Sequence, residues 1–298
     1  MTEKPDILSI GAVLWDIIGR TAVAMPPGAD RPGRIVRLPG GVALNIAMTL
    51  ARFGKRPAVL TAIGQDAEGD DLIAACEAMG IGCAHVWRAP GRPTDRYLAI
   101  EGPEGLVAAI ADAHTLEEAG AAILTPLADG RLGSADRPWA GPVALDGNLA
   151  ADLLATIATS PLFRAADLRV APASPGKALR LSPLLPVANA TLYVNLEEAA
   201  LLCGASPDSA PQAAAALIAK GARRVLVTDG ARAAADGCAR QGVLCAAPPS
   251  VGMARVTGAG DTFMAAHIVA ESAGRDREAA LAAALAAAAR YVAGEDCT

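Results

Sequence analysis

The amino-acid sequence predicts an α/β protein whose mainly parallel sheet is covered by helices on both faces, with a small second sheet as a lid. From residue 142 onward, short apolar runs alternate with stretches of helical spacing, which is typical of right-handed βαβ units. Two earlier segments, approximately 12–38 and 94–111, break this alternation. We expect them to form the lid, inserted in one domain that spans residues 1–298.

The first half of the chain holds the strands of the predicted lid and the first helices. The helix expected at 41–54 ends in a glycine, and the helix at 66–80 has an acidic first turn before its glycine stop. Thr115 and Glu118 form a T-x-x-E pattern that predicts a capped helix start directly after His114. The strands expected in this half are 6–14, 34–39, 56–64, 82–88, 94–100 and 105–111, the last two paired with each other.

The second half alternates regularly between the two kinds of element. The expected strands are 142–146, 167–172, 191–195, 223–230, 231–236 and 243–248. The expected helices are 149–158, 196–204, 211–221, 258–273 and 276–292. No internal repeat or heptad pattern interrupts this order.

Composition and missing motifs exclude several classes of function. The net charge is −5 and no basic run exists, which argues against nucleic-acid binding. No apolar run is long enough to span a bilayer and no signal peptide is evident, so we expect a cytoplasmic protein without membrane contact. The sequence has no P-loop motif, and the first strand is not followed by G-x-G-x-x-G. An NAD-dependent oxidoreductase is therefore disfavoured.

The stretch RVTGAGDTFMAAH at 255–267 places a glycine-rich turn directly before a helix. Free backbone N–H groups at the positive end of a helix form an anion site. Asp261 stands at that point and has two interpretations: an N-terminal cap, or a general base beside an oxyanion hole. This stretch alone favours the cap.

Four motifs in a fixed order change that balance. They are V-T-G-A-G-D-T-F at 256–263, G-G-V-A-L-N-I-A at 40–47 with A-I-G-Q-D-A-E-G-D at 62–70, N-L-E-E at 195–198 and V-T-D-G at 227–230. Together they cover nearly the whole chain, which resembles the ribokinase (PfkB) family of sugar and nucleoside kinases. The resemblance implies a ribokinase-like three-layer α/β/α sandwich and ATP with Mg²⁺ as cofactors.

The resemblance also implies roles at the phosphate end of the site. Asp261 would take the proton from the acceptor hydroxyl, and Gly258, Ala259 and Gly260 would hold the charge of the transferred phosphoryl group. Asn195 and Glu198 would organise water and Mg²⁺, so that Glu198 contacts the metal only indirectly; Thr228 and Gly230 would lie along ATP. The alternatives are a helix cap for Asn195 and Glu198, and a strand-ending turn for Thr228 and Gly230.

On the acceptor side, the resemblance assigns sugar hydroxyls to Asp16, Gly40, Gly41 and Asn45. Two adjacent glycines permit a close approach of the backbone, and carboxylates or amides bridge neighbouring hydroxyls. The alternatives are a capping role for Asp16 and a helix-start turn for the glycines.

The segment 92–113 and the D-G-N at 146–148 are similar to the pseudouridine kinase branch of that family. The similarity places Thr94 and Asn148 near the base of a nucleoside, with Asp146 as a further candidate at the same strand end. A generic lid strand and a helix start remain the alternative. The same family often has an acid, linked to a monovalent cation site, where this chain has Arg255; a fixed positive charge there argues against K⁺ dependence.

Three functions remain open from the sequence. The leading one is ATP-dependent phosphorylation of the 5′-hydroxyl of pseudouridine or a related nucleoside. The second is a kinase for a free sugar, ribose or a keto-sugar, and the third a catalytically silent metabolite-binding protein on the same scaffold. The expected partner is thus a small-molecule nucleoside or sugar, and the exposed lid edge suggests a homodimer.

Overall fold

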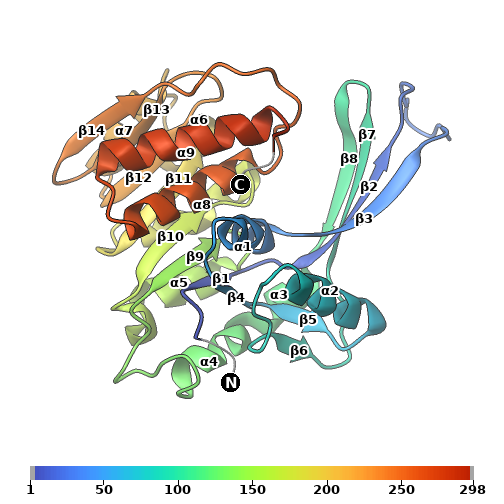
Figure 1. Ribbon diagram of the computed structural model, residues 1–298, viewed down its shortest axis with the longest axis horizontal. Helices are drawn as coiled ribbons and strands as arrows, with labels where there is room; N and C mark the ends of the chain where they lie inside the picture. The colour runs from blue at the N-terminus through green and yellow to red at the C-terminus, as the bar shows by residue number, and fades with distance from the viewer. Residues whose placement is uncertain (1–3, 296–298) are drawn as a thin grey trace.

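An eight-stranded sheet forms the centre of the computed structural model, which describes residues 4–295 (Figure 1). Its strands, in spatial order, are β14 (Gly242–Ala246), β13 (Ala234–Cys238), β12 (Arg224–Thr228), β11 (Ala190–Asn195), β10 (Asp167–Ala171), β9 (Pro142–Asp146), β1 (Ile7–Ile10) and β4 (Pro57–Leu60). The strands from β12 to β4 are parallel, and β13 is antiparallel to both of its neighbours. The chain leaves β1 first toward β4 and later returns on the other side at β9. Such a reversal of strand order is where open parallel sheets bind their ligands.

Helices cover both faces of this sheet because successive side chains of each strand point to opposite sides. On β11, Leu192 and Val194 join one buried cluster, whereas Tyr193 joins another. The helices on the Leu192 side are α5 (Ala151–Thr159), the 3₁₀ segment η3 (Pro175–Leu184), α6 (Leu196–Cys203) and α7 (Ala210–Ala219). Those on the Tyr193 side are α1 (Val42–Arg52), α8 (Ala259–Ser272) and α9 (Arg277–Val292). The predicted three-layer sandwich is confirmed.

A separate four-stranded sheet projects from this body (Figure 1). Its order is β3 (Arg34–Gly40), β2 (Leu14–Arg20), β7 (Arg96–Gly102) and β8 (Gly105–Asp112). The expected pairing of the last two strands is present and antiparallel. Large apolar side chains of this sheet are exposed, among them Ile35 at 78 % and Ile110 at 66 %.

The remaining elements are short or lie outside the two sheets already described. They are β5 (Ala62–Gly64), α2 (Ala67–Ala78), β6 (Trp87–Ala89), α3 (His114–Ala119), η1 (Gly120–Leu124), α4 (Thr125–Ala128) and η2 (Pro161–Phe163). None of the helices in the described residues is long and apolar enough to cross a bilayer.

Four local expectations need correction. The run 56–64 is two strands rather than one, since β4 ends at Leu60 in the large sheet and β5 begins at Ala62 in a two-stranded sheet with β6. The run 6–14 is two strands rather than one, since the chain leaves the large sheet after Ile10 and enters the small one at Leu14. Of the strand expected at 82–88, only the last two residues belong to β6, because a turn closed by Val86 N–H and Cys83 O comes before it. The cap predicted at Thr115 is also wrong. The N–H groups of Thr115 and Leu116 donate to the buried carboxylate of Asp95, at 2.9 and 3.0 Å.

Candidate active site

A cavity of about 370 Å³ opens at the carboxyl ends of the central strands. It is bounded by the end of β11, the segment after β10 and the starts of α1, α6 and α8. Seven residues that the sequence places in the site line it: Asn45, Asn195, Glu198, Thr228, Gly258, Gly260 and Asp261. Segments more than 200 residues apart in sequence thus meet in one cavity.

The start of α8 contributes a helix end without a side-chain cap. Gly258 is the N-cap residue, with φ of 89°, and no side chain accepts a bond from the first turn. The N–H of Ala259 donates to Val256 O at 3.0 Å, within the preceding turn. The N–H groups of a first helical turn have no intrahelical acceptor, and the helix dipole adds positive potential. This end of α8 can therefore receive an anion.

Asp261 lies in the first turn of α8 and faces Asn45 of α1. The Asn45 Nδ2 donates to Asp261 Oδ2 at 3.1 Å. The pKa of Asp261 is raised to about 7, mainly by burial; the bond from Asn45 opposes this rise, and the nearby carboxylates of Asp146 and Glu198 add to it. A carboxylate with a pKa near neutrality is well matched to abstract a proton at physiological pH.

The start of α6 is closed by its own side chains. Glu198 N–H donates to Asn195 Oδ1 at 2.9 Å, and Asn195 N–H donates to Glu198 Oε2 at 2.8 Å, which together form a capping box. Burial raises the pKa of Glu198 above its ordinary value. The capping interpretation of this pair is thus correct, and both residues line the cavity as well.

Thr228 ends β12 at the cavity wall. Gly230 follows two residues later in a turn, with φ of 57°, and is not among the residues that line the cavity. The two therefore mark a strand end and its turn, next to the phosphate-side residues.

The acceptor-side residues meet at the root of the small sheet. A Cβ at Gly40 would lie 2.0 Å from Asp16 Oδ2, so the glycine lets the carboxylate reach the backbone. Gly41, at φ of 99°, is the N-cap of α1, and a Cβ there would lie 2.4 Å from Ala12 O. Burial raises the pKa of Asp16 to about 6. Asn45 in α1 connects this group to Asp261.

Thr94 has a structural partner instead of an open cavity. Its side chain is 1 % exposed, and its hydroxyl donates to Asp66 Oδ1 at 2.5 Å. Its N–H donates to the other oxygen of Asp66, which is also the N-cap of α2. Thr94 thereby ties the approach to β7 to the start of α2.

Asn148 is held from two sides. Its Nδ2 donates to Asp146 Oδ2 at 3.0 Å, and its Oδ1 accepts a bond of 2.5 Å from Lys177 Nζ. Burial lowers the pKa of Lys177. Both polar atoms of the Asn148 side chain therefore already have a partner, and a ligand would have to share or replace one of these bonds.

Asp146 holds together several segments around the site, although the sequence predicted it only as a further candidate for base binding. Its side chain has no solvent exposure, and burial raises its pKa. It accepts bonds from the N–H groups of Ala12, Ala43 and Asn148, at 2.9, 3.3 and 2.8 Å. A Cβ at Gly11 would lie 2.3 Å from Asp146 Cβ. The sequence signal was the glycine at the end of the first strand together with an acid at the end of β9.

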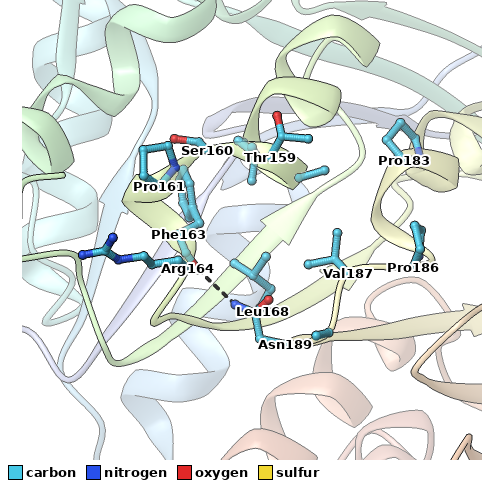
Figure 2. A pocket seen from close by; sticks show the side chains of 13 residues that line it. Thr159, Ser160, Pro161, Phe163, Arg164, Leu168, Pro183, Pro186, Val187 and Asn189 are labelled. Carbon is cyan, nitrogen blue, oxygen red and sulfur yellow. Dashed lines mark hydrogen bonds between the residues drawn. The ribbon is translucent and has the colours of Figure 1, made fainter. Parts of the chain in front are cut away.

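A larger cavity, of about 510 Å³, lies at the opposite end of the strands, beside the amino ends of β10 and β11 (Figure 2). Arg164 is the one ionisable group among its lining residues. The Asn189 amide is engaged with Phe163 O and Ala166 O. This cavity holds no group for acid–base chemistry, so we place the reaction in the smaller one.

A central parallel sheet between helical layers, a small separate sheet and an open helix start beside a carboxylate together define the class of ribokinase-fold kinases. A carbohydrate kinase from Agrobacterium tumefaciens has a similar structure, with a TM-score of 0.77 and 26 % identity over 95 % of this chain and 89 % of that one.

The profile of the pfkB family carbohydrate kinases matches residues 4–298. The chain belongs to this family. Its similarity to curated relatives is modest: it is 34 % identical over 53 % of its length to the uncharacterized sugar kinase YeiI of Escherichia coli strain K12, and 32 % identical over 34 % to the pseudouridine kinase of that strain. The matched parts amount to 42 % and 32 % of those two proteins, less than half of either.

Proposed function

We propose that this protein transfers a phosphoryl group from ATP to a nucleoside hydroxyl, with the 5′-hydroxyl of pseudouridine as the preferred acceptor. One observation carries the proposal: the Asp261 carboxylate, whose pKa is raised to about 7, lies beside the uncapped start of α8. This pairs a base for the acceptor proton with a site for the phosphoryl charge.

In this mechanism each residue has a physical task. Asp261 accepts the proton of the acceptor hydroxyl as its oxygen attacks, which contributes about 10²–10⁴-fold to the rate. The backbone from Gly258 to Gly260 stabilises the charge on the transferred group. Asn45 donates to Asp261 and so orients its carboxylate. Phosphoryl transfer needs alignment and charge stabilisation above all.

The wall of the cavity fits a Mg²⁺ ion that is held through water. Carboxylate oxygen is the ligand type that Mg²⁺ prefers, and the ion keeps several waters when it binds nucleotide phosphates. Glu198 is buried at this wall, and the described residues contain no cluster of three or more His, Cys, Asp or Glu placed to hold a metal directly. Asn195 and Glu198 would hold the waters of the ion, which would neutralise phosphate charge. Thr228 and Gly230 would lie along ATP.

Separate observations support the nucleoside as acceptor. The D-G-N at the end of β9 and the similarity to a pseudouridine kinase favour it. In this proposal Asp16, Gly40, Gly41 and Asn45 bind the sugar hydroxyls. Asn148, and Thr94 once its bond to Asp66 is exchanged, face the base.

Two other functions are alternatives to this proposal. A free-sugar kinase is supported by the similarity to YeiI, whose name gives a sugar kinase. A silent binding protein would keep the same cavity, but it has no need of a carboxylate with a raised pKa.

A screen of acceptors separates these functions. The purified protein is incubated with ATP, Mg²⁺ and pseudouridine, uridine, adenosine, ribose or fructose, and ADP release is measured. We expect the highest kcat/KM with pseudouridine. Turnover of ribose or fructose without any nucleoside would establish the sugar kinase, and ligand binding without ADP release would establish the silent protein.

We also propose that the reaction needs no K⁺. The Arg255 guanidinium already provides a fixed positive charge beside the loop that leads into α8, donating to Tyr291 O at 2.8 Å. Equal rates in sodium and potassium buffers of the same ionic strength would support this, and a strong preference for K⁺ would contradict it.

We further propose that the small sheet is both a lid over the cavity and a dimer interface. We also propose that the protein is cytoplasmic, where ATP is available. Ile35, Leu98 and Ile110 share one face of this sheet by their strand register and are exposed at 78 %, 40 % and 66 %, and a single sheet layer gains stability by burying such a face. A second copy of the chain presents the same apolar surface. Sedimentation equilibrium of the wild type should give twice the mass of one chain. The Ile35→Lys variant should give the mass of a single chain.

A further inference from the structure

The loop that leads into α8 is exposed and is fastened to the last turn of α9. Met253 and Val256 are 77 % and 61 % exposed. The N–H groups of Ala254 and Arg255 both donate to Val292 O, at 2.9 and 3.2 Å. Because its large apolar side chains face solvent, the loop takes its conformation from these bonds to α9 more than from burial.

Arg255 adds charge to this attachment. Its guanidinium carbon lies 3.9 Å from the centre of the Tyr291 ring. Its Nε donates to Tyr291 O at 2.8 Å and its Nη2 to Glu295 O at 3.4 Å. Carbonyls at the end of a helix lack intrahelical donors and carry the negative end of the dipole, and a guanidinium supplies both donors and positive charge.

Tyr291 reaches from the same turn to the edge of the anion site. Its hydroxyl donates to Thr257 O at 2.8 Å. A Cβ at Gly258 would lie 2.6 Å from Tyr291 Oη, so the tyrosine packs directly against the N-cap of α8. One side chain therefore fixes the peptide before the open helix start and limits the next residue to glycine.

We propose that Arg255 and Tyr291 form a clamp that holds residues 254–258 in the conformation that presents the start of α8 to an anion. They are positioning residues, since they act through the loop and not on the substrate. The guanidinium serves as a permanent cation at the C-terminal end of α9. Its effect on catalysis rests on the proposed function, whereas its effect on the loop does not.

The clamp predicts a specific response to added cations. If Arg255 is replaced by glycine, Tyr291 O and Glu295 O lose the bonds from the guanidinium, and a space of guanidinium size opens beside the Tyr291 ring. Free guanidinium, at concentrations far below those that denature proteins, should enter this space and restore the loop. The Tyr291→Phe variant keeps the ring beneath Arg255 and loses only the bond to Thr257 O.

The first test is hydrogen exchange of the whole protein without substrate. We expect the peptide that covers residues 254–260 to exchange faster in Arg255→Gly and, to a smaller extent, in Tyr291→Phe, while β11 and α6 keep their protection. Arg240→Gly, in the exposed turn between β13 and β14, is the matched control and should change nothing near α8. Unchanged exchange of 254–260 in both clamp variants would overturn the proposal.

The second test is kinetic, with ATP and the best acceptor from the screen. Arg255→Gly should lower kcat at least about 10-fold and change the acceptor KM by less than about 2-fold, because the loop and not the acceptor site is displaced. Guanidinium should raise the kcat of this variant at least about 3-fold over sodium chloride at equal ionic strength, and raise neither wild type nor Arg240→Gly. Absence of this rescue overturns the cation role. A wild type that turns over no acceptor refutes the proposed function, and hydrogen exchange still decides on the clamp.

Discussion

Two helices begin at the same cavity, but only one of them has its first N–H groups capped by side chains. The start of α6 is closed by the reciprocal bonds of Asn195 and Glu198, whereas the start of α8 has a glycine N-cap and no side-chain acceptor. Each carries an acid in its first turn. At α6 the acid satisfies the backbone of its own helix; at α8 Asp261 instead contacts Asn45 of another helix. A carboxylate at a helix start can therefore act on a substrate when the helix does not use it to cap its own backbone.

The largest expected difference between the two acids is in catalysis. Asp261→Asn should lower kcat at least about 10²-fold because no other group would take the acceptor proton. Glu198→Gln should lower it less, by about 10-fold, because its amide can still accept the bond from Asn195 N–H and hold water. Steady-state kinetics of both variants measure the difference. Equal losses, or a larger loss at Glu198, would contradict the assignment of the base.

A second comparison uses the glycines that flank the two helices. Gly258→Ala should lower kcat about 10-fold, because alanine at a positive φ is strained and its Cβ meets Tyr291 Oη. Gly204 ends α6 with φ of 64°, and a Cβ there would meet only Lys220 Nζ at 3.9 Å. Gly204→Ala should cost about 1 kcal/mol of stability and leave kcat unchanged. A similar loss of kcat in both variants would mean that the α8 start has no special role.

A third comparison concerns the loss of a helix cap, at α6 beside the cavity and at α9. Asn195→Ala removes the cap of α6 and should cost about 1 kcal/mol in the free energy of unfolding, with a rise of about 3–10-fold in the KM for ATP. Asp276 caps α9 through Ala279 N–H, far from the cavity. Asp276→Ala should cost about the same stability and leave the KM for ATP as it is. Denaturant unfolding and kinetics of the two variants decide, and an unchanged KM in Asn195→Ala would leave Asn195 a cap alone.

The last comparison concerns pH. With a pKa of about 7 in the folded protein and 3.8 as its ordinary value, Asp261 keeps a proton between pH 4 and 7 that the unfolded chain has released. Stability attributable to this group therefore falls as pH rises through that interval and stays low above it. Asp261→Asn does not titrate, so its free energy of unfolding should rise relative to that of wild type between pH 4 and pH 8. A constant difference between the two proteins would refute the raised pKa, as would a kcat/KM that does not rise through pH 7.

Local patterns were sufficient to predict most of the fold and most of the predicted site residues that line the cavity. The glycines, the acid and the helix of 255–267 are adjacent in sequence, and so are the two residues of the α6 cap. The expected elements of the second half correspond to helices and strands of the structure, because alternating runs of that length leave little choice.

Long-range bonds could not be predicted in the same way. The cap of α3 is Asp95, 20 residues before the N–H that it accepts, so the nearby T-x-x-E was misleading. Thr94 lies next to Asp95 and pairs with Asp66, 28 residues away. In both cases the partner was set by how the segment just before β7 lies against the starts of α2 and α3, which no sequence period encodes.

The close approach of Gly11 to Asp146 has a consequence for how such chains can vary. Any side chain at position 11 would occupy the space of the Asp146 carboxyl, and that carboxyl is the acceptor for Ala12 and Ala43. The two positions are therefore not independent in evolution. In a library of active variants, a residue larger than glycine at 11 should be found only together with a smaller one at 146, and the pair should be inherited as a unit.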